Sequence, residues 1–427
     1  MSIGHWNAAG NQTDPVSQAE SRSGSANPQA RAALAPLRPL APAPDRAPVP
    51  ASAAWREGDE VGRRQFVSVG DLTLESGVVL PDVVVAYETW GQLNADRSNA
   101  VLIEHALTAD SHVVGPIEPG HNSPGWWEGI VGPGRAIDTN KWFVIATNVL
   151  GGCQGTTGPA SLSPDGAPWG ADFPQVTARD QVLAEIAVAD ALGIEQWALV
   201  VGGSMGGMRA LEWAIMEPER VKRLGVFAAP AQTSGDHIAW AAPQLAAIRM
   251  DPAWNGGQYY DAEPGHGPHH GLGIARRIAH TTYRSSHELD TRFGHQPQGE
   301  GDTLVAGPTQ ERGRFAVESY LDHHADKLAR RFDANSYIVL TDSILSHDVG
   351  RGRGGVAAAL KRVTATTLVV GVDTDRLYPV AQQERIANGI SSALPLEVIR
   401  SPYGHDGFLI EGDQVGGLLR GLLSEEA

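Results

Sequence analysis

The sequence predicts an α/β fold, in which a mostly parallel sheet carries helices on both of its faces. Short and nearly continuous apolar runs recur along the chain, as expected for strands that are covered on both faces of a parallel sheet. They lie at 101–103, 142–146, 198–201, 224–228, 367–370 and 396–399. Helical patterns separate several of them, and β-branched, alternating residues over about 63–91 predict an opening antiparallel meander.

Composition narrows the function classes. The chain has 427 residues, of which 42% are hydrophobic, so it can bury a large core. Its net charge of -16 argues against nucleic acids and anionic membranes as main partners. No apolar stretch reaches the roughly 18 residues of a membrane span, and no secretory signal is visible. The single Cys153 excludes an intramolecular disulfide framework and suits a reducing compartment, so a cytoplasmic enzyme is expected.

Changes in composition and residue pattern divide the chain into four segments. Residues 1–55 are rich in Ala, Pro, Ser and Arg and predict a disordered tail. Residues 56–231 predict the first part of the α/β core. Residues 232–350 are helix-biased and nearly free of strand-like runs, which predicts a helical lid inserted into the core. Residues 351–427 predict the second part of the core, and no internal repeat is evident.

The stretch "VVGGSMGG" places Ser204 between four glycines. By itself, this pattern also fits a flexible glycine-rich turn, which occurs by chance in many chains. Here, however, an apolar strand precedes Ser204, and "MGGMRALEWAIMEPERV" predicts a helix that Pro218 ends. A serine at a tight strand-to-helix turn is a nucleophile elbow, and its glycines allow backbone segments to approach closely. The context favours a nucleophilic Ser204.

A serine nucleophile needs a base, and the base needs an orienting carboxylate. Asp373 and Asp375 follow the apolar run at 367–370, and His405 follows the next strand. All three would lie with Ser204 at the carboxyl ends of parallel strands, where the active sites of open α/β sheets lie. The two aspartates compete for the orienting role, and Asp375 also suits a simple helix N-cap.

An acyl-transfer site also needs donors for the oxyanion. The N–H of Met205, directly after the nucleophile, is one expected donor. The second should come from the loop after the strand at 101–103, where Leu107 is the candidate. His105 and His112 in the same loop are expected to be core or loop histidines rather than catalysts.

Longer blocks of sequence identify a family. "NVLGGCQGTTGPASL", "VVGGSMGGMRALEWA", "RRFDANSYIVLTDSILSHDVGRGRGG", "DTDRLYP" and "YGHDGFL" together resemble the homoserine O-acetyltransferases, which have the α/β-hydrolase fold. The resemblance covers roughly residues 60–423. It implies Ser204 as nucleophile, Asp375 as orienter and His405 as base. It also implies that Arg276 holds the substrate carboxylate and that Asp406 binds the substrate amino group.

The resemblance further implies a two-step reaction of methionine biosynthesis. Acetyl-CoA, as co-substrate, would acetylate Ser204, and the hydroxyl of L-homoserine would then take the acetyl group. No bound cofactor and no metal are expected, and such enzymes are usually homodimers. Succinyl-CoA as donor, serine as acceptor, or a serine esterase or thioesterase are the alternatives on the same scaffold. A non-catalytic binding protein is disfavoured because Ser204, Asp375 and His405 are all present.

Three other features receive simpler interpretations. His266, His269 and His270 lie in a Gly/Pro-rich stretch without regular ligand spacing, which favours a solvated loop over a metal site. Arg351 and Arg353 could line a path for the CoA phosphates or equally pair with acidic neighbours. Cys153 has no evident base nearby and is expected to be a small buried side chain. No signature of nucleotide or dinucleotide binding is present.

Overall fold

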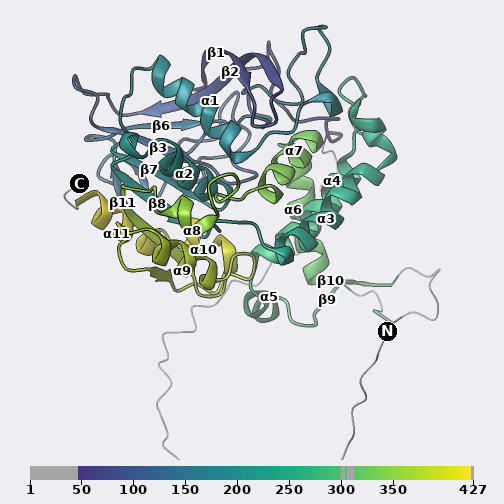
Figure 1. Ribbon diagram of the computed structural model, residues 1–427. Helices are drawn as coiled ribbons and strands as arrows, with labels where there is room; N and C mark the ends of the chain where they lie inside the picture. Colours follow the sequence, from purple (N-terminus) through teal and green to yellow (C-terminus); the bar gives the residue numbers. More distant parts are fainter. Residues whose placement is uncertain (1–46, 300–302, 305–311, 425–427) are drawn as a thin grey trace, which may run out of the picture. The chain divides into compact units, whose positions relative to one another are not determined.

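Figure 1 shows the computed structural model, which describes residues 47–299, 303–304 and 312–424. These residues belong to one unit, 43–427, and the other unit, 1–42, lies outside them. Most of the predicted tail therefore also lies outside the described residues. Its last part, from 47 to 55, contacts the core. The Ser52 hydroxyl donates to Asp333 (2.7 Å), and the Trp55 N–H donates to the Cys153 carbonyl (2.9 Å). Contacts with the core thus begin upstream of the predicted boundary.

An eight-stranded sheet forms the centre, in the order β1-β2-β6-β3-β7-β8-β11-β12. β1 and β2 pair antiparallel, β2 pairs antiparallel with β6, and the remaining neighbours are parallel. The predicted meander and the predicted parallel strands are therefore confirmed. The strands are β1 (Gln65–Thr73), β2 (Val79–Trp90), β3 (Ala100–Glu104), β6 (Phe143–Thr147), β7 (Leu199–Gly203), β8 (Arg223–Phe227), β11 (Thr366–Val372) and β12 (Glu397–Ile399).

The central strands are buried on both faces, which explains their continuous apolar runs. Along β3, Leu102 belongs to one hydrophobic cluster, while Val101 and Ile103 belong to another. Side chains of a strand alternate between its faces, so the two clusters lie on opposite faces of the sheet. The first cluster includes residues of α1 (Ala178–Ala191), α2 (Met205–Met216) and α9 (Val380–Gly389), and the second includes residues of α11 (Gly412–Ser424).

Among the described residues, five α-helices lie within 232–350, the segment predicted to be helical. α3, α4, α6 and α7 gather on one side of the sheet in Figure 1, and α3 and α6 both pack against α4. The helices are α3 (Gly235–Met250), α4 (His269–Tyr283), α5 (Ser286–Arg292), α6 (Ala316–Ala329) and α7 (Ala334–Leu345). The limits of this segment and its function as a lid remain predictions.

The prediction of a solvated loop at His266, His269 and His270 is wrong for two of these residues. His266 lies in an exposed loop, but His269 and His270 form the first turn of α4. Pro268 stands just before this helix, where its fixed φ and missing N–H disrupt no helical hydrogen bond. Within the described ranges, every helix is too short or too polar to cross a membrane.

Candidate active site

Ser204 lies at the turn between β7 and α2 with a strained backbone, at φ 58° and ψ −125°. Such conformations cost about 1–3 kcal/mol and cluster at active sites. The neighbouring glycines are required for packing. A Cβ on Gly206 would collide with the Glu104 carbonyl oxygen, and a Cβ on Gly202 would collide with the Gly206 backbone. The turn therefore has the geometry expected of a nucleophile elbow.

Asp375 and His405 lie in the loops after β11 and β12, as their positions in the sequence predict. His405 Nδ1 lies 2.7 Å from Asp375 Oδ2. The other oxygen of Asp375 accepts the N–H groups of Leu377 and Tyr378, which fixes the carboxylate. Burial alone would lower the pKa of His405, but the charge and hydrogen bond of Asp375 raise it above its ordinary value.

The structure separates the two competing aspartates. Asp373 accepts the backbone N–H of Ser401 (3.0 Å), and its other oxygen faces the Arg400 guanidinium (3.4 Å). Asp373 therefore ties the β11 loop to the β12 loop, while Asp375 contacts the histidine ring. Asp375 also caps the backbone turn after it, so the capping contact is compatible with the predicted orienting role.

One cavity of about 400 Å³ brings most of the predicted site residues together. Its wall includes Leu107, Ser204, Arg276, His405 and Asp406. Asp375 lies behind the His405 ring and is not part of the wall. The cavity therefore joins the predicted nucleophile, base and substrate-binding residues in one space.

The two predicted oxyanion donors come from the loop after β3 and from the start of α2. Leu107 occupies a turn after β3 and lines the cavity. Met205 is the first residue of α2, so its N–H has no carbonyl partner within the helix. The positive end of the helix dipole adds to this N–H, and both favour negative charge at the turn. The Met205 side chain is buried in the core, so only its backbone enters the prediction.

Arg276 and Arg277, adjacent on α4, have different environments. Arg277 pairs with Asp322 (2.7 Å). Arg276 lines the cavity, and its guanidinium lies 5.4 Å from the centre of the Tyr283 ring. Its Nε and Nη1 atoms are buried without a hydrogen-bond partner among the described residues. Arg276 is thus the arginine that is available to a ligand.

Asp406 faces the same cavity but is already paired. Arg284 Nη1 lies 3.2 Å from Asp406 Oδ2, and the same guanidinium also binds Glu288. Burial raises the pKa of Asp406, and the charges of His405, Arg284 and Arg276 oppose this shift. An ammonium ligand at Asp406 would therefore share the carboxylate with Arg284.

Sequence reasoning missed much of the cavity wall, which α4 and α6 supply. A helical period could have found these residues. Arg276, His280 and Arg284 recur every four residues, and four residues also separate His324 from Leu328 and Lys327 from Arg331. The missed wall residues include His280, Tyr283, Arg284, His324, Lys327 and Arg331.

The cavity carries an excess of positive charge. Within the described part of the chain, Arg276, Lys327 and Arg331 form no ion pair with a carboxylate. Burial, Arg331 and Arg276 lower the pKa of Lys327, in that order. In a chain of net charge -16, this local excess favours anionic ligands in the cavity.

Three further sequence features lie outside the cavity wall. Arg351 pairs with Glu75 (2.8 Å) and Arg353 with Glu212 (2.6 Å), so both arginines have acidic partners. Cys153 is buried, and burial raises the pKa of its thiol well above the ordinary value, which suits an inert side chain.

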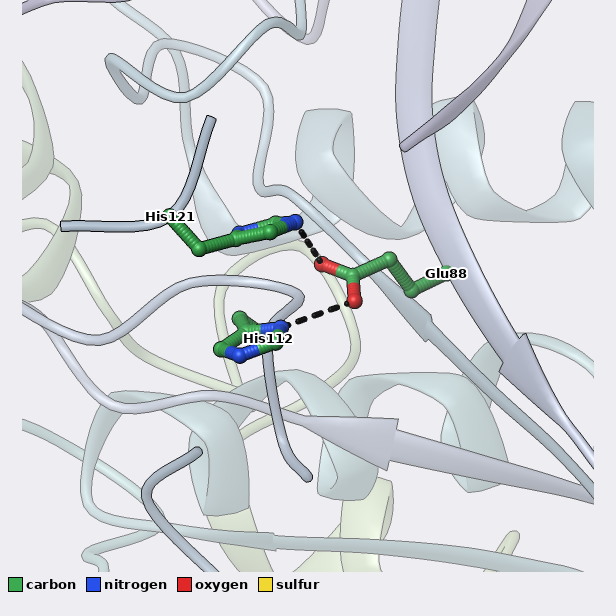
Figure 2. Close-up of side chains that lie close together, drawn as sticks. All are labelled: Glu88, His112 and His121. Atoms are coloured by element: carbon green, nitrogen blue, oxygen red, sulfur yellow. Dashed lines mark hydrogen bonds and ion pairs between the residues drawn. The ribbon is translucent and has the colours of Figure 1, made fainter. Parts of the chain in front are cut away.

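A second polar cluster lies beside the loop that carries Leu107. Figure 2 shows the Glu88 carboxylate beside the stacked rings of His112 and His121, with one oxygen directed to each ring. His112 Nδ1 lies 3.0 Å from Glu88 Oε2, and His121 Nε2 lies 3.8 Å from Glu88 Oε1. Among the described residues, these three side chains have the types and spacing that could hold a metal ion.

Comparison with known proteins places the chain in a family. A family model for the alpha/beta hydrolase fold matches residues 99–411. The homoserine O-acetyltransferase of Thermobifida fusca is 63% identical over 379 residues, which cover 88% of this chain and 98% of that protein. The homoserine O-acetyltransferase of Mycobacterium leprae is 52% identical over 372 residues, which cover 87% of this chain and 94% of that protein.

The fold is similar to that of solved structures of an acetyltransferase and of a hydrolase. The homoserine O-acetyltransferase of Bacillus anthracis superimposes with a TM-score of 0.76 at 28% identity, covering 85% of this chain and 98% of that one. An acetylester hydrolase of Corynebacterium glutamicum gives a TM-score of 0.72 at 27% identity, covering 85% of this chain and 97% of that one. The two sequence relatives are far more similar to this chain than the solved structures are, and the similarity spans nearly their whole length. This chain therefore belongs to the homoserine O-acetyltransferase family within the α/β hydrolases.

Proposed function

We propose that the protein transfers the acetyl group of acetyl-CoA to the hydroxyl of L-homoserine, as a step of methionine biosynthesis. The observation that carries this proposal is the unpaired Arg276 guanidinium in the same cavity as Ser204 and Asp406. An amino acid acceptor needs a cation for its carboxylate and an anion for its ammonium, and arginine provides a planar, bidentate donor. The names of the relatives support homoserine as the acceptor and acetyl as the transferred group.

The first half-reaction acetylates the enzyme. His405 accepts the proton of the Ser204 hydroxyl, and Ser204 Oγ attacks the thioester carbonyl carbon. The N–H groups of Leu107 and Met205 stabilise the resulting oxyanion, and one such donor is worth about 3–4 kcal/mol of barrier. The C–S bond then breaks, and the CoA sulfur leaves with the proton that His405 holds. Acetyl-Ser204 and neutral His405 remain.

The second half-reaction consumes L-homoserine. Its side-chain hydroxyl gives a proton to His405 and attacks the acetyl carbonyl carbon, which again forms an oxyanion at Leu107 and Met205. The bond to Ser204 Oγ breaks, and Oγ recovers the proton from His405. The product is O-acetyl-L-homoserine. Arg276 and Asp406 hold the acceptor so that its hydroxyl, rather than water, meets the acetyl group.

A plain esterase or thioesterase is the alternative of a different class. Its acceptor is water, which uses neither a carboxylate clamp nor an ammonium partner, so the unpaired Arg276 disfavours it. Succinyl-CoA as donor or serine as acceptor would keep the same mechanism with another substrate pair.

The resemblance also predicts a homodimer in the cytoplasm. Both remain predictions, and sedimentation of the purified full-length chain tests the dimer.

Release of CoA tests the function. Acetyl-CoA and succinyl-CoA are each supplied with homoserine, with serine and with no acceptor, and the Ser204→Ala variant serves as control. We expect release that rises sharply only with acetyl-CoA plus homoserine and that the variant abolishes. Release at one rate with every acceptor would instead identify a hydrolase and contradict the proposal.

A further inference from the structure

The loop after β3, residues 105–112, carries Leu107 and is fixed at its start by a buried arginine. Arg209 Nη2 donates to the carbonyl of His105 (2.8 Å). The His105 ring holds two further points, because its Nε2 accepts the N–H of Val149 (3.1 Å) and its Nδ1 lies 2.8 Å from the Ala106 carbonyl. Three contacts therefore fix the beginning of the loop.

Glu88 fixes the far end of the loop. The Ser111 hydroxyl donates to Glu88 Oε1 (2.8 Å), and the His112 ring contacts the other oxygen, as Figure 2 shows. Burial alone would lower the pKa of His112, but the hydrogen bond and the charge of Glu88 raise it above its ordinary value. A charged His112 and a Glu88 carboxylate suit an ion pair that holds the loop to β2.

Hydrogen bonds explain this cluster better than a metal ion does. The backbone N–H of Arg63 donates to His121 Nε2 (3.1 Å), the nitrogen that faces Glu88. His112 Nε2 lies 3.2 Å from the Pro116 carbonyl, and its Nδ1 faces the carboxylate. His121 Nε2 and His112 Nε2 therefore have backbone partners, and His112 Nδ1 is already in contact with the Glu88 carboxylate without a cation. We therefore treat Glu88, His112 and His121 as the far anchor of the loop.

Arg331 holds the middle of the loop. It follows α6, and its Nη1 donates to the Thr108 carbonyl (2.6 Å), directly after Leu107. Its own carbonyl accepts the side chain of Gln154 (3.1 Å), which fixes the backbone from which the arginine reaches. Arg331 also lines the cavity together with Ser204. The guanidinium thus connects α6 to the backbone of the predicted oxyanion donor.

Few negative charges compensate the charge of Arg331. A contact that only stabilised the fold would not require an uncompensated buried cation. In the described part of the chain no carboxylate pairs with it, and its Nε is buried without a hydrogen-bond partner. Burial lowers its pKa and the nearby Arg276 lowers it further, while the charge of Asp110 opposes this shift only in part. Burying such a group costs stability. A cation here, however, favours the negative charge that develops beside Leu107 during acyl transfer.

We propose that Arg331 is a positioning residue of the acyl-transfer reaction, and that its hydrogen bond to the Thr108 carbonyl holds the Leu107 N–H towards the oxyanion. This inference rests on the proposed acyl transfer at Ser204. It assigns to Arg331 a role in both half-reactions, because the oxyanion forms in each. It assigns to Arg331 no direct contact with homoserine.

The test uses the full-length chain with Arg331→Met, which removes the donor and keeps much of the volume. The rate of acetylation by acetyl-CoA without acceptor, and kcat with homoserine, should both fall about a hundredfold, the scale for a misplaced catalytic group. Rates are counted per Ser204 that can be acetylated, so loss of folded protein does not imitate the effect. KM for homoserine should stay within about twofold, as expected for an interaction made only in the transition state.

Two variants serve as controls. Arg331→Lys restores a donor and a charge and should recover part of both rates. Arg330→Met changes the neighbouring arginine, which pairs with Asp326 (3.0 Å), and should leave both rates at the wild-type level. A raised KM for homoserine with unchanged acetylation would make Arg331 a substrate ligand and overturn the proposal. Equal losses in Arg330→Met and Arg331→Met would also overturn it.

Failure of the proposed function gives a different result. If the wild-type chain is acetylated but water rather than homoserine discharges it, the acetylation rate of Arg331→Met still decides the role of Arg331. If the wild-type chain is never acetylated, the acyl-transfer proposal itself fails, whatever Arg331 does.

Discussion

If His405 is the base, the contact between Asp375 and His405 should set the pH dependence of activity. The charge and hydrogen bond of Asp375 outweigh burial and raise the pKa of His405 above its ordinary value of about 6.5. Only the neutral ring can accept the Ser204 proton, so kcat/KM should rise with pH through this raised pKa and fall below it. Asp375→Asn removes the raising charge. The acid limb of the pH profile should then move to lower pH, and kcat should fall on the order of 10⁴-fold.

The neighbouring aspartate provides the matched control. Asp373 contacts Ser401 and Arg400 and, among the described residues, forms no hydrogen bond or ion pair with the His405 ring. Asp373→Asn should therefore leave the acid limb of the kcat/KM profile in place. A profile that shifts with Asp373→Asn and not with Asp375→Asn would reverse the two assignments.

Arg276 is expected to act on the acceptor alone. Its guanidinium has buried, unpartnered nitrogens in the cavity, whereas Arg277 is paired with Asp322. Arg276→Gln should raise KM for homoserine at least about tenfold, since truncating one partner of a buried charge pair costs about 2–5 kcal/mol. Acetylation by acetyl-CoA without acceptor should change little.

Steady-state kinetics with varied homoserine, together with the acetylation rate, measure this split. Arg277→Gln is the control, and its KM should match the wild type. If Arg276→Gln slows acetylation as much as it weakens the use of homoserine, the proposed carboxylate site is wrong.

At the scale of elements, a buried ion cluster joins β3, α1 and α2 behind the elbow. Arg209 on α2 lies 2.8 Å from Glu104 on β3 and 2.6 Å from Glu185 on α1, and all three side chains are buried. Trp213 also donates to Glu185 (2.9 Å). Burial raises the pKa of Glu104, and the charge of Arg209 opposes this. The cluster holds β3, which precedes the loop that carries Leu107, against α2, which follows Ser204.

Removing the cation should destabilise the fold strongly. Arg209→Met leaves two buried carboxylates without their partner, a change that costs about 3–5 kcal/mol in other proteins. Urea unfolding of the variant and the wild type measures the difference. Arg249→Met, which breaks a partly exposed pair with Asp342, should cost much less. Equal losses for the two variants would show that the buried cluster has no special role.

Elements with a strong local pattern were predictable from the sequence. The apolar runs that became β3, β6, β7, β8 and β11 are buried on both faces, so their composition alone indicated their place in the sheet. The helix after Ser204 was equally clear and ends at Met216, just before Pro218. The position of His269 was not, because a Gly/Pro-rich stretch can precede a helix as well as form a loop.

At the scale of the whole molecule, the order of Ser204, Asp375 and His405 along strand ends was readable, but the cavity wall was not. The wall joins the β3 loop to α4 and α6, and contacts such as that of Arg331 with Thr108 span a large sequence separation. The choice between Asp373 and Asp375 also needed the fold, because both follow the same strand. Local sequence patterns predict the helices and strands, but only their packing shows which side chains are in contact.

The central claim is that Ser204 carries the acetyl group between the two substrates. Intact mass of the full-length chain, mixed rapidly with acetyl-CoA in the absence of acceptor, tests it most directly. The mass should increase by one acetyl group, located on the peptide that contains Ser204, and homoserine should remove this group far faster than water or serine does. An unmodified chain that still turns over acetyl-CoA and homoserine would contradict it.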